Sequence, residues 1–400
     1  MLNELAQEIT ESIGEIIDHT VLITDEFGMI IGISDDIARL GTLHRASIDV
    51  IRSGKPRFHD ILEANRLEVK PGYTAPILLA TKIVGTVAIK GEPEDVGKFI
   101  FIVKKQVEIL LQQEIFLKAS ILHEQALQNL IKEISVFNPT TGDENLILNI
   151  GNELGYDLTH PRIAVIIDFY HYDDFTYDIY QQAPLQDAPE MMIELIKVRA
   201  HNTIKGTFNS AEDICTSMAK DKFVVLHSIT KDKSDKYILE QTIEKCTKLE
   251  SYLMKIGVRV TIGIGSIANN LLEIRNTYKD AWSALTIGKK IYGQQPMIFN
   301  IYDLYLEELI SNVNNHISNK FVVTTLNSLK KQPDWDELSR TISAWCEASF
   351  NLSTTSKILH IHKNTLLYRL KKIERISGYN LRIFKESVAL YLALKMTPLL

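Results

Sequence analysis

One long helical pattern constrains the fold of this chain more than any other feature. From residue 94 to about residue 133 the sequence contains no proline, and a helix of about 35 residues is longer than most helices of globular domains. Apolar residues recur along it at steps of three or four, and more loosely towards its end: Ile100, Val103, Val107, Leu110, Leu117, Ile121 and Leu130. We therefore predict a linking helix over residues 96–135 whose apolar stripe pairs two copies of the chain. The alternative is an ordinary helix that packs on its own domain.

The segment before this helix, residues 1–95, predicts a small domain with one sheet. A helical spacing of apolar residues comes first, and two strand–turn–strand patterns follow it. The first pairs residues 21–25 with 30–33, and the second pairs residues 75–80 with 83–89. Helices and antiparallel strands in this order are typical of an α+β sensor of the PAS kind, with a pocket on one face of the sheet.

The remainder of the chain divides into two further segments. Residues 140–295 contain three buried strand patterns and amphipathic helices between and after them; the strands are predicted at 162–168, 223–226 and 258–265. Residues 300–400 carry helical patterns throughout. We therefore predict an α+β multidomain chain with a PAS-like N-terminal sensor, a long linking helix, an α/β domain and an all-α C-terminal domain.

The composition of the chain excludes several classes of protein. The 44 basic and 50 acidic residues give a net charge of −6, which excludes a wholly basic nucleic-acid coat protein but not a local basic patch. The three cysteines stand far apart, which argues against a disulfide framework and a structural zinc site. No apolar run approaches the ~18 residues that span a bilayer, and the N-terminus is acidic where a signal peptide is basic. We expect a soluble cytoplasmic protein that does not contact membranes.

A reversal of charge marks residues 353–376 of the C-terminal segment. Six basic residues stand there against one acidic residue, although the whole chain is acidic. The pattern predicts a short helix over 351–359 capped by Ser353, a turn over 360–363, and a second helix that Asn364 caps and that ends before Gly378. Such a pair of helices is typical of a helix-turn-helix, whose basic side chains meet phosphates while its second helix reaches base edges. The alternative is a solvated basic helix in a plain helical bundle.

The second of these helices supplies the residues that we expect to contact DNA. Its apolar residues Leu366, Leu370 and Ile373 fall in one arc, and most of its polar residues fall on the opposite side. The expected DNA-binding residues are Lys363, Asn364, Thr365, Tyr368, Arg369, Lys371, Lys372 and Arg375. We expect the cations to neutralise phosphates, and Asn364 and Thr365 to determine sequence preference.

Longer motifs in the same segments resemble a known family. The run His360-Ile-His-Lys-Asn-Thr-Leu366, followed by Tyr368-Arg-Leu370, resembles the helix-turn-helix that ends the CdaR/PucR-type transcription regulators. The runs Arg39-Leu-Gly-Thr-Leu-His44 and Lys70-Pro-Gly72 resemble the sugar-diacid recognition domain of the carbohydrate diacid regulators. The middle segment is similar to the degenerate GGDEF-like domain of these regulators. The resemblance covers nearly the whole chain in the domain order of the family.

This resemblance implies a role for each segment and an effector pocket in the first one. Residues 1–95 would form the sugar-diacid recognition domain, 96–135 the signalling and dimerisation helix, 140–295 the degenerate GGDEF-like domain, and 300–400 the PucR-type DNA-binding domain. A diacid needs a fork of donors for each carboxylate, which an arginine supplies through two parallel N–H bonds. The expected ligand-binding residues are Arg39, Gly41, Thr42, His44, Lys70 and Gly72.

The middle segment lacks residues that GGDEF catalysis requires. A functional domain of this kind holds the phosphates of GTP on a Gly-Gly-acid-acid-Phe loop and holds Mg²⁺ on carboxylates. The residues in frame, 218–222, lack both glycines and keep only Asp221 as an acid, while Asp168 is a remnant metal carboxylate at most. We therefore expect no enzyme activity, no catalytic residue, no metal site and no cofactor.

The function that the resemblance implies is that of a ligand-responsive, homodimeric transcription regulator that binds operator DNA. The expected effector is a small hydroxylated diacid, such as glucarate or galactarate, or glycerate, and the expected role is activation of the genes for its use. An alternative of the same class is a regulator that senses another metabolite, such as an intermediate of purine catabolism. An alternative of another class is a nucleotide-binding or cyclase protein that uses the GGDEF-like domain.

Overall fold

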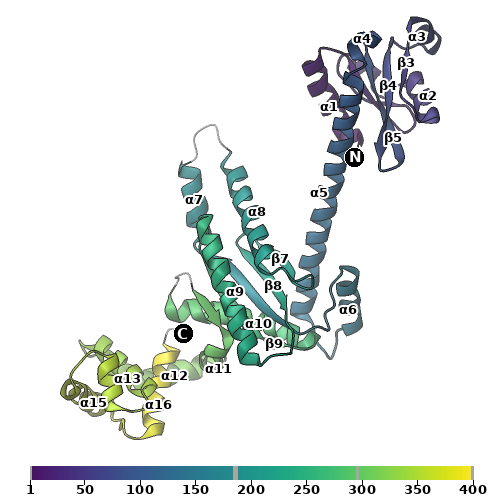
Figure 1. Ribbon diagram of the computed structural model, residues 1–400. Helices are drawn as coiled ribbons and strands as arrows, with labels where there is room; N and C mark the ends of the chain where they lie inside the picture. Colours follow the sequence, from purple (N-terminus) through teal and green to yellow (C-terminus); the bar gives the residue numbers. More distant parts are fainter. Residues whose placement is uncertain (1, 183–187, 294–296, 398–400) are drawn as a thin grey trace. The chain divides into compact units, whose positions relative to one another are not determined.

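The computed structural model describes residues 2–182, 188–293 and 297–397 (Figure 1). Backbone contacts divide the chain into two compact units, residues 1–123 and 124–400. Within the described ranges, no helix is both long enough and apolar enough to cross a membrane.

The first unit contains a five-stranded antiparallel sheet with helices on both faces (Figure 1). The strands follow the spatial order β2-β1-β5-β4-β3. In chain order, the elements are α1 (Leu2–Ile17), β1 (Val21–Asp25), β2 (Ile30–Ile33), the 3-10 turn η1 (Ile37–Arg39), α2 (Arg45–Ser53), β3 (Arg57–His59), α3 (Ile61–Leu67), β4 (Gly72–Leu79), β5 (Lys82–Lys90) and α4 (Pro93–Val96). Both predicted strand pairs are present. The assignment of this domain to the PAS kind stays a prediction.

Strand alternation gives this sheet one apolar face and one partly polar face. Apolar side chains of the first face pack against α1 and the start of the long helix; they include Val21, Ile23, Ala75, Ile77, Val87 and Ile89. The intervening positions of the same strands face the side on which α2 lies, and they include Leu22, Thr24, Thr74, Thr86 and Ala88. Buried hydroxyl groups therefore collect beneath α2.

The predicted long helix is α5 (Phe99–Val136), which has 38 residues. Its first turns bury Ile100, Val103, Val107 and Leu111 in the core of the first unit. Its last turns bury Leu127, Leu130, Ile131 and Ile134 in the core of the second unit. Between these turns, large apolar side chains are exposed: Phe116 by 77%, Leu117 by 54%, Ile121 by 49% and Leu122 by 65%. The two ends of the helix therefore pack on domain cores, and the pairing of two copies stays a prediction.

The second unit begins with an α/β domain whose sheet has the order β10-β9-β6-β8-β7. Its elements are α6 (Glu144–Glu153), β6 (Arg162–Phe169), α7 (Tyr172–Gln182), α8 (Pro189–Thr207), β7 (Ile214–Ala219), β8 (Lys222–Ser228), α9 (Asp235–Lys255), β9 (Val260–Ala268), α10 (Leu271–Tyr292) and β10 (Ile298–Asn300). Among the described strands of this sheet, only β10 and β9 pair in parallel. Helices α8 and α9 cover one face, and α10 with the end of α5 covers the other. Every residue of the central strand β6 is therefore buried.

A helical domain follows, after the 3-10 turn η2 (Ile301–Asp303). Its helices are α11 (Tyr305–Ser311), α12 (Asn315–Lys330), α13 (Trp335–Glu347), α14 (Leu352–Ile358), α15 (Lys363–Ser377) and α16 (Phe384–Met396). Helices α14 and α15 correspond to the predicted pair of helices, and α15 ends at Gly378 in the left-handed conformation, as predicted. Both predicted N-caps are wrong. The side chain of Asn351 caps α14 in place of Ser353, and that of His362 caps α15 in place of Asn364.

Candidate functional site

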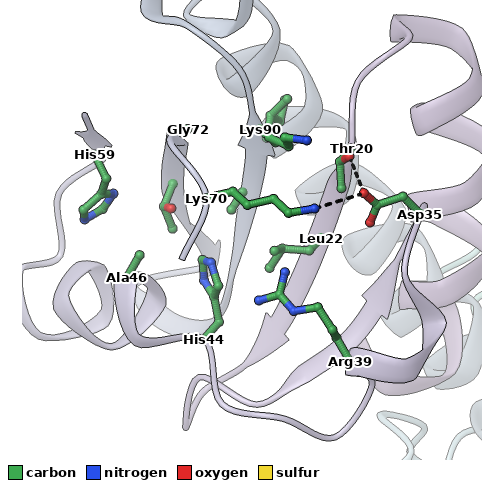
Figure 2. A pocket seen from close by; sticks show the side chains of 13 residues that line it. Thr20, Leu22, Asp35, Arg39, His44, Ala46, His59, Lys70, Gly72 and Lys90 are labelled. Atoms are coloured by element: carbon green, nitrogen blue, oxygen red, sulfur yellow. Dashed lines mark hydrogen bonds and ion pairs between the residues drawn. The ribbon is translucent and has the colours of Figure 1, made fainter. Parts of the chain in front are cut away.

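A pocket lies on the partly polar face of the first sheet, beside α2 (Figure 2). Thirteen residues line it: Thr20, Leu22, Asp35, Arg39, His44, Ala46, His59, Lys70, Gly72, Thr74, Ala88, Ile89 and Lys90. Four of the six ligand-binding residues predicted from the sequence are among them, namely Arg39, His44, Lys70 and Gly72. They come from η1, the start of α2 and the start of β4, so folding brings together residues that lie up to 33 positions apart in the sequence.

The structure does not place the other two predicted ligand residues, Gly41 and Thr42, in the pocket wall. From the sequence, we expect their backbone N–H groups to bind the ligand as well. Instead, the N–H of Gly41 donates to the Ile30 carbonyl at 2.9 Å, and the N–H of Thr42 donates to the Arg39 carbonyl at 3.0 Å. These bonds hold the loop against β2, so the two residues position Arg39 and do not offer donors to a ligand.

The charge of the pocket favours an anion. Arg39, Lys70 and Lys90 bring three permanent cations, whereas Asp35 is the one carboxylate among the lining residues. The Nζ atom of Lys70 lies 4.0 Å from Asp35, which also accepts a hydrogen bond of 2.8 Å from the Thr20 hydroxyl (Figure 2). Among the described residues, no acidic side chain forms an ion pair with Arg39 or Lys90. These two cations are therefore available to carboxylates of a ligand.

His44 is a neutral hydrogen-bonding group in the pocket wall. Burial, with a smaller contribution from the nearby Arg39, lowers the pKa of His44 to about 4. Its Nδ1 atom lies 2.7 Å from the Ser47 hydroxyl, which accepts a bond of 2.6 Å from Thr86. Because Ser47 accepts from Thr86, its own hydrogen is free to bond to Nδ1, and the proton of the imidazole then resides on Nε2. His44 can therefore donate an N–H to a ligand without adding charge.

The cavity that these residues enclose is small in this structure. Its free volume is about 30 Å³, which is room for one or two water molecules. The side chain of Lys70 is 52% exposed and forms a long, screened contact with Asp35. A ligand larger than water therefore requires lining side chains to move, and movement of the exposed Lys70 breaks only one weak ion pair.

The second candidate site is the exposed face of α15. The structure leaves six of the eight predicted DNA-binding residues exposed: Lys363, Asn364, Thr365, Tyr368, Lys371 and Arg375. Apolar side chains on the opposite face of α15, those of Leu366, Leu370 and Ile373, are buried in the core of the helical domain. The exposed basic face and the buried apolar face of α15 thus match a recognition helix that enters the major groove.

Arg369 and Lys372 do not share this exposed face. The side chain of Arg369 forms an ion pair with Glu337, and Lys372 donates to both carboxylate oxygens of Asp334 at 2.7 Å. Each basic side chain is only 18% exposed. These contacts fasten α15 to the start of α13, so both residues hold the helix in place rather than present a free cation.

The α/β domain neutralises the carboxylate that resembles a metal ligand. Asp168 lies near the end of β6, and its side chain is 6% exposed. Lys222 contacts one of its oxygens at 3.1 Å, and Lys289 forms an ion pair with the other. Within the described residues, no three His, Cys, Asp or Glu side chains are arranged to hold a metal ion. The two ammonium groups thus occupy both oxygens of Asp168.

Comparison with known protein families assigns each part of the chain. Residues 1–134 match the sugar diacid recognition family, residues 139–287 match the GGDEF-like domain, and residues 338–396 match the PucR C-terminal helix-turn-helix domain. The three matches occur in the order that the sequence motifs predicted.

Curated relatives include one that matches over almost its full length. The carbohydrate diacid regulator of Escherichia coli (strain K12) is 26% identical over 405 aligned residues, which cover 98% of this chain and 97% of that protein. The purine catabolism regulatory protein of Bacillus subtilis (strain 168) is 31% identical, but over only 35% of this chain and 27% of its own length. The DNA-binding transcriptional activator AdeR of the same organism is 29% identical over 34% of this chain and 33% of its own length. The chain is therefore a DNA-binding transcription regulator of the CdaR/PucR family.

Proposed function

We propose that this regulator binds a small hydroxylated diacid, or glycerate, in the pocket of its first unit and activates genes for the use of that acid. The charge of the pocket carries this proposal, because Arg39, Lys70 and Lys90 outnumber the single carboxylate of Asp35. Two carboxylates of a diacid match this excess of positive charge. The full-length similarity to a carbohydrate diacid regulator supports the same class of effector.

In this proposal the ligand replaces Asp35 as the partner of Lys70. The Lys70–Asp35 contact is 4.0 Å long and partly exposed, so it contributes little stability. One ligand carboxylate pairs with Arg39 and the other with Lys70 and Lys90. Asp35 keeps its bond to the Thr20 hydroxyl, while Lys70 moves from Asp35 to the ligand.

Thermal unfolding in the presence of candidate acids tests the proposal. We would compare glucarate, galactarate, glycerate and the plain dicarboxylate succinate, each with the wild type, Arg39→Ala and Arg52→Ala. Arg52 is an exposed arginine of α2 outside the pocket, so its variant is the matched control. A ligand at a hundred times its dissociation constant adds about 2.7 kcal/mol to the stability of the unit that binds it. An acid that raises the melting temperature of the wild type and of Arg52→Ala, but not of Arg39→Ala, supports binding in the pocket. An increase that persists in Arg39→Ala contradicts it.

The lining of the pocket favours an aliphatic acid over a purine derivative. None of the thirteen lining residues is Phe, Tyr or Trp, although flat heteroaromatic rings are commonly bound by stacking on such side chains. Urate and hypoxanthine in the same thermal assay separate the two classes. Stabilisation by either purine, and by none of the acids, would replace our proposal with the purine alternative.

We also propose that the chain acts as a homodimer through α1 and α5. A groove of about 590 Å³ lies between these helices, and apolar side chains dominate its wall: Leu5, Ile9, Ile13 and Ile16 from α1, and Leu110 and Leu117 from α5. Leu110 and Leu117 lie one heptad apart, and Ile121 follows Leu117 by four residues, so all three can lie on one coiled-coil seam. A second copy of α5 fits this surface, because its exposed Phe116 and Ile121 supply matching apolar side chains.

We propose that the regulator acts in the cytoplasm, where it meets chromosomal DNA. We also propose that the GGDEF-like domain is a spacer without enzyme activity. Asp168 cannot bind Mg²⁺ unless the ion displaces both Lys222 and Lys289. Incubation of the purified chain with GTP and Mg²⁺ tests this point. Any cyclic nucleotide product would contradict it and favour the cyclase alternative.

A further inference from the structure

A buried histidine of the pocket wall has no hydrogen-bond partner. His59 is the last residue of β3 and is 1% exposed. Among the described residues, neither of its ring nitrogens is bonded to another group. The ring nevertheless lines the same pocket as His44 and Lys70 (Figure 2). A buried polar group without a partner costs folding free energy, so one that faces a cavity indicates a partner that enters the cavity.

Backbone strand pairing, and not a hydrogen bond of the imidazole, holds His59 in place. In the antiparallel sheet His59 pairs with Gly72, and Gly72 pairs with Lys90. Directly paired residues of neighbouring strands project from the same face, so these three positions form one row on the face of the pocket. Gly72 lacks a side chain, which leaves the space between the His59 ring and Lys90 open. A Cβ at Gly72 would lie 2.3 Å from the Ile89 carbonyl oxygen, so the sheet itself requires this glycine.

His59 offers a bonding capacity that the cations of the pocket lack. Burial lowers the pKa of His59, and the ring is therefore neutral at neutral pH, with one N–H donor and one acceptor nitrogen. Arginine and lysine side chains only donate. Oδ2 of Asp35 accepts from Thr20 and contacts Lys70, and Nδ1 of His44 lies against Ser47, whereas neither ring nitrogen of His59 has a partner among the described residues. A ligand hydroxyl, which must donate its hydrogen, finds a free acceptor at His59.

We propose that His59 binds a hydroxyl group of the effector and thereby selects hydroxylated acids over plain carboxylic acids of the same length. This inference rests on the proposed function, which assigns the effector to this pocket. The acceptor nitrogen of His59 takes the hydroxyl hydrogen, and its N–H donates to a neighbouring hydroxyl or carboxylate oxygen. The carboxylates of both kinds of acid pair with Arg39, Lys70 and Lys90, so these cations do not discriminate between the two kinds.

Calorimetric titration of the full chain with two matched acids tests this role. Glucarate and adipate are both six-carbon dicarboxylates, but only glucarate carries hydroxyl groups. We expect the wild type to prefer glucarate. In His59→Phe, which keeps a ring without bonding nitrogens, the dissociation constant for glucarate should rise about tenfold, the loss expected for roughly one hydrogen bond. The constant for adipate should not change. His59→Gln, which keeps a donor and an acceptor, should retain part of the preference, and His123→Gln on the exposed part of α5 should retain all of it.

The stability of the ligand-free variants provides a second readout. Because His59 makes no hydrogen bond within the described part of the chain, His59→Phe should not lower the melting temperature of the ligand-free chain. A preference for glucarate that persists in His59→Phe would overturn the role of His59 while leaving the proposed function intact. Equal affinity of the wild type for glucarate and adipate would likewise overturn the role of His59 and leave the proposed function intact. A wild type that binds neither these acids nor glycerate would refute the proposed function, and this inference with it.

Discussion

Two adjacent lysines of α15 test which face of this helix meets DNA. Lys371 is exposed, whereas Lys372 is 18% exposed at its side chain and donates to both oxygens of Asp334 at 2.7 Å. Lys371→Ala removes a cation from the proposed DNA-binding face. Lys372→Ala instead breaks an ion pair inside the helical domain. The two variants therefore change the net charge equally but should affect DNA binding differently.

The expected effects can be given as numbers. The slope of log K against log salt concentration is negative, and each phosphate contact that is lost reduces its magnitude by about 0.9 for B-form DNA. Lys371→Ala should therefore reduce the magnitude of the slope by about one, and Lys372→Ala should leave it nearly unchanged. Since Lys372 and Asp334 are both partly exposed, the loss of their ion pair should lower the free energy of unfolding only slightly.

Fluorescence anisotropy with a labelled random-sequence duplex, at several salt concentrations, measures these slopes. Arg369→Ala serves as a second internal control, because Arg369 is paired with Glu337. Equal reductions of the slope in Lys371→Ala and Lys372→Ala would refute the distinction between the two faces. A slope that Lys371→Ala leaves unchanged would refute the contact between this face and phosphate.

Three further predictions concern the first unit. Gly32→Ala should lower the free energy of unfolding by about 1–3 kcal/mol in denaturant titrations, because a Cβ there would lie 2.4 Å from the Ala6 carbonyl oxygen. Gly206→Ala is the control, because a Cβ there would meet no atom of the described residues within 4 Å apart from its own helix backbone and chain neighbours. The pKa of His44 falls to about 4 on folding from an ordinary value of 6.5, so the unfolded chain binds the extra proton between these values. The free energy of unfolding should therefore fall as the pH drops from 6.5 to 4, and less so in His44→Asn. Combined Leu117→Glu and Ile121→Glu should convert a dimer into a monomer in sedimentation experiments; a dimer that persists would contradict pairing through α5.

The sequence predicted those parts of the pocket that lie within short motifs. Arg39, His44, Lys70 and Gly72 belong to two runs of three to six residues, and the structure brings all four to one cavity. His59 and Lys90 were missed, because only the register of β3, β4 and β5 places them beside Gly72. Strand pairing that brings together residues 31 positions apart cannot be predicted from a local sequence pattern. The bonds that occupy the N–H groups of Gly41 and Thr42 depend on tertiary contacts in the same way.

The basic helix shows a similar limit. Counting charges over residues 353–376 located α15, but it could not reveal which cations were already neutralised. The partners of Arg369 and Lys372 lie 32 and 38 residues earlier, at the start of α13. The N-caps failed for a local reason, because Asn351 and Ser353 are both good capping residues two positions apart. For the long helix, periodicity predicted its extent, whereas only packing shows which turns are buried and which remain exposed.

We propose that an acid bound in the first unit changes how α15 binds DNA. The most direct test is the dissociation constant of the full chain for the genomic fragments that it selects, measured with and without the acid that stabilises the first unit. Coupling between the two sites predicts a change of about 5- to 150-fold, and the change should disappear in Arg39→Ala but not in Arg52→Ala. A dissociation constant that the bound acid leaves unchanged would contradict the claim.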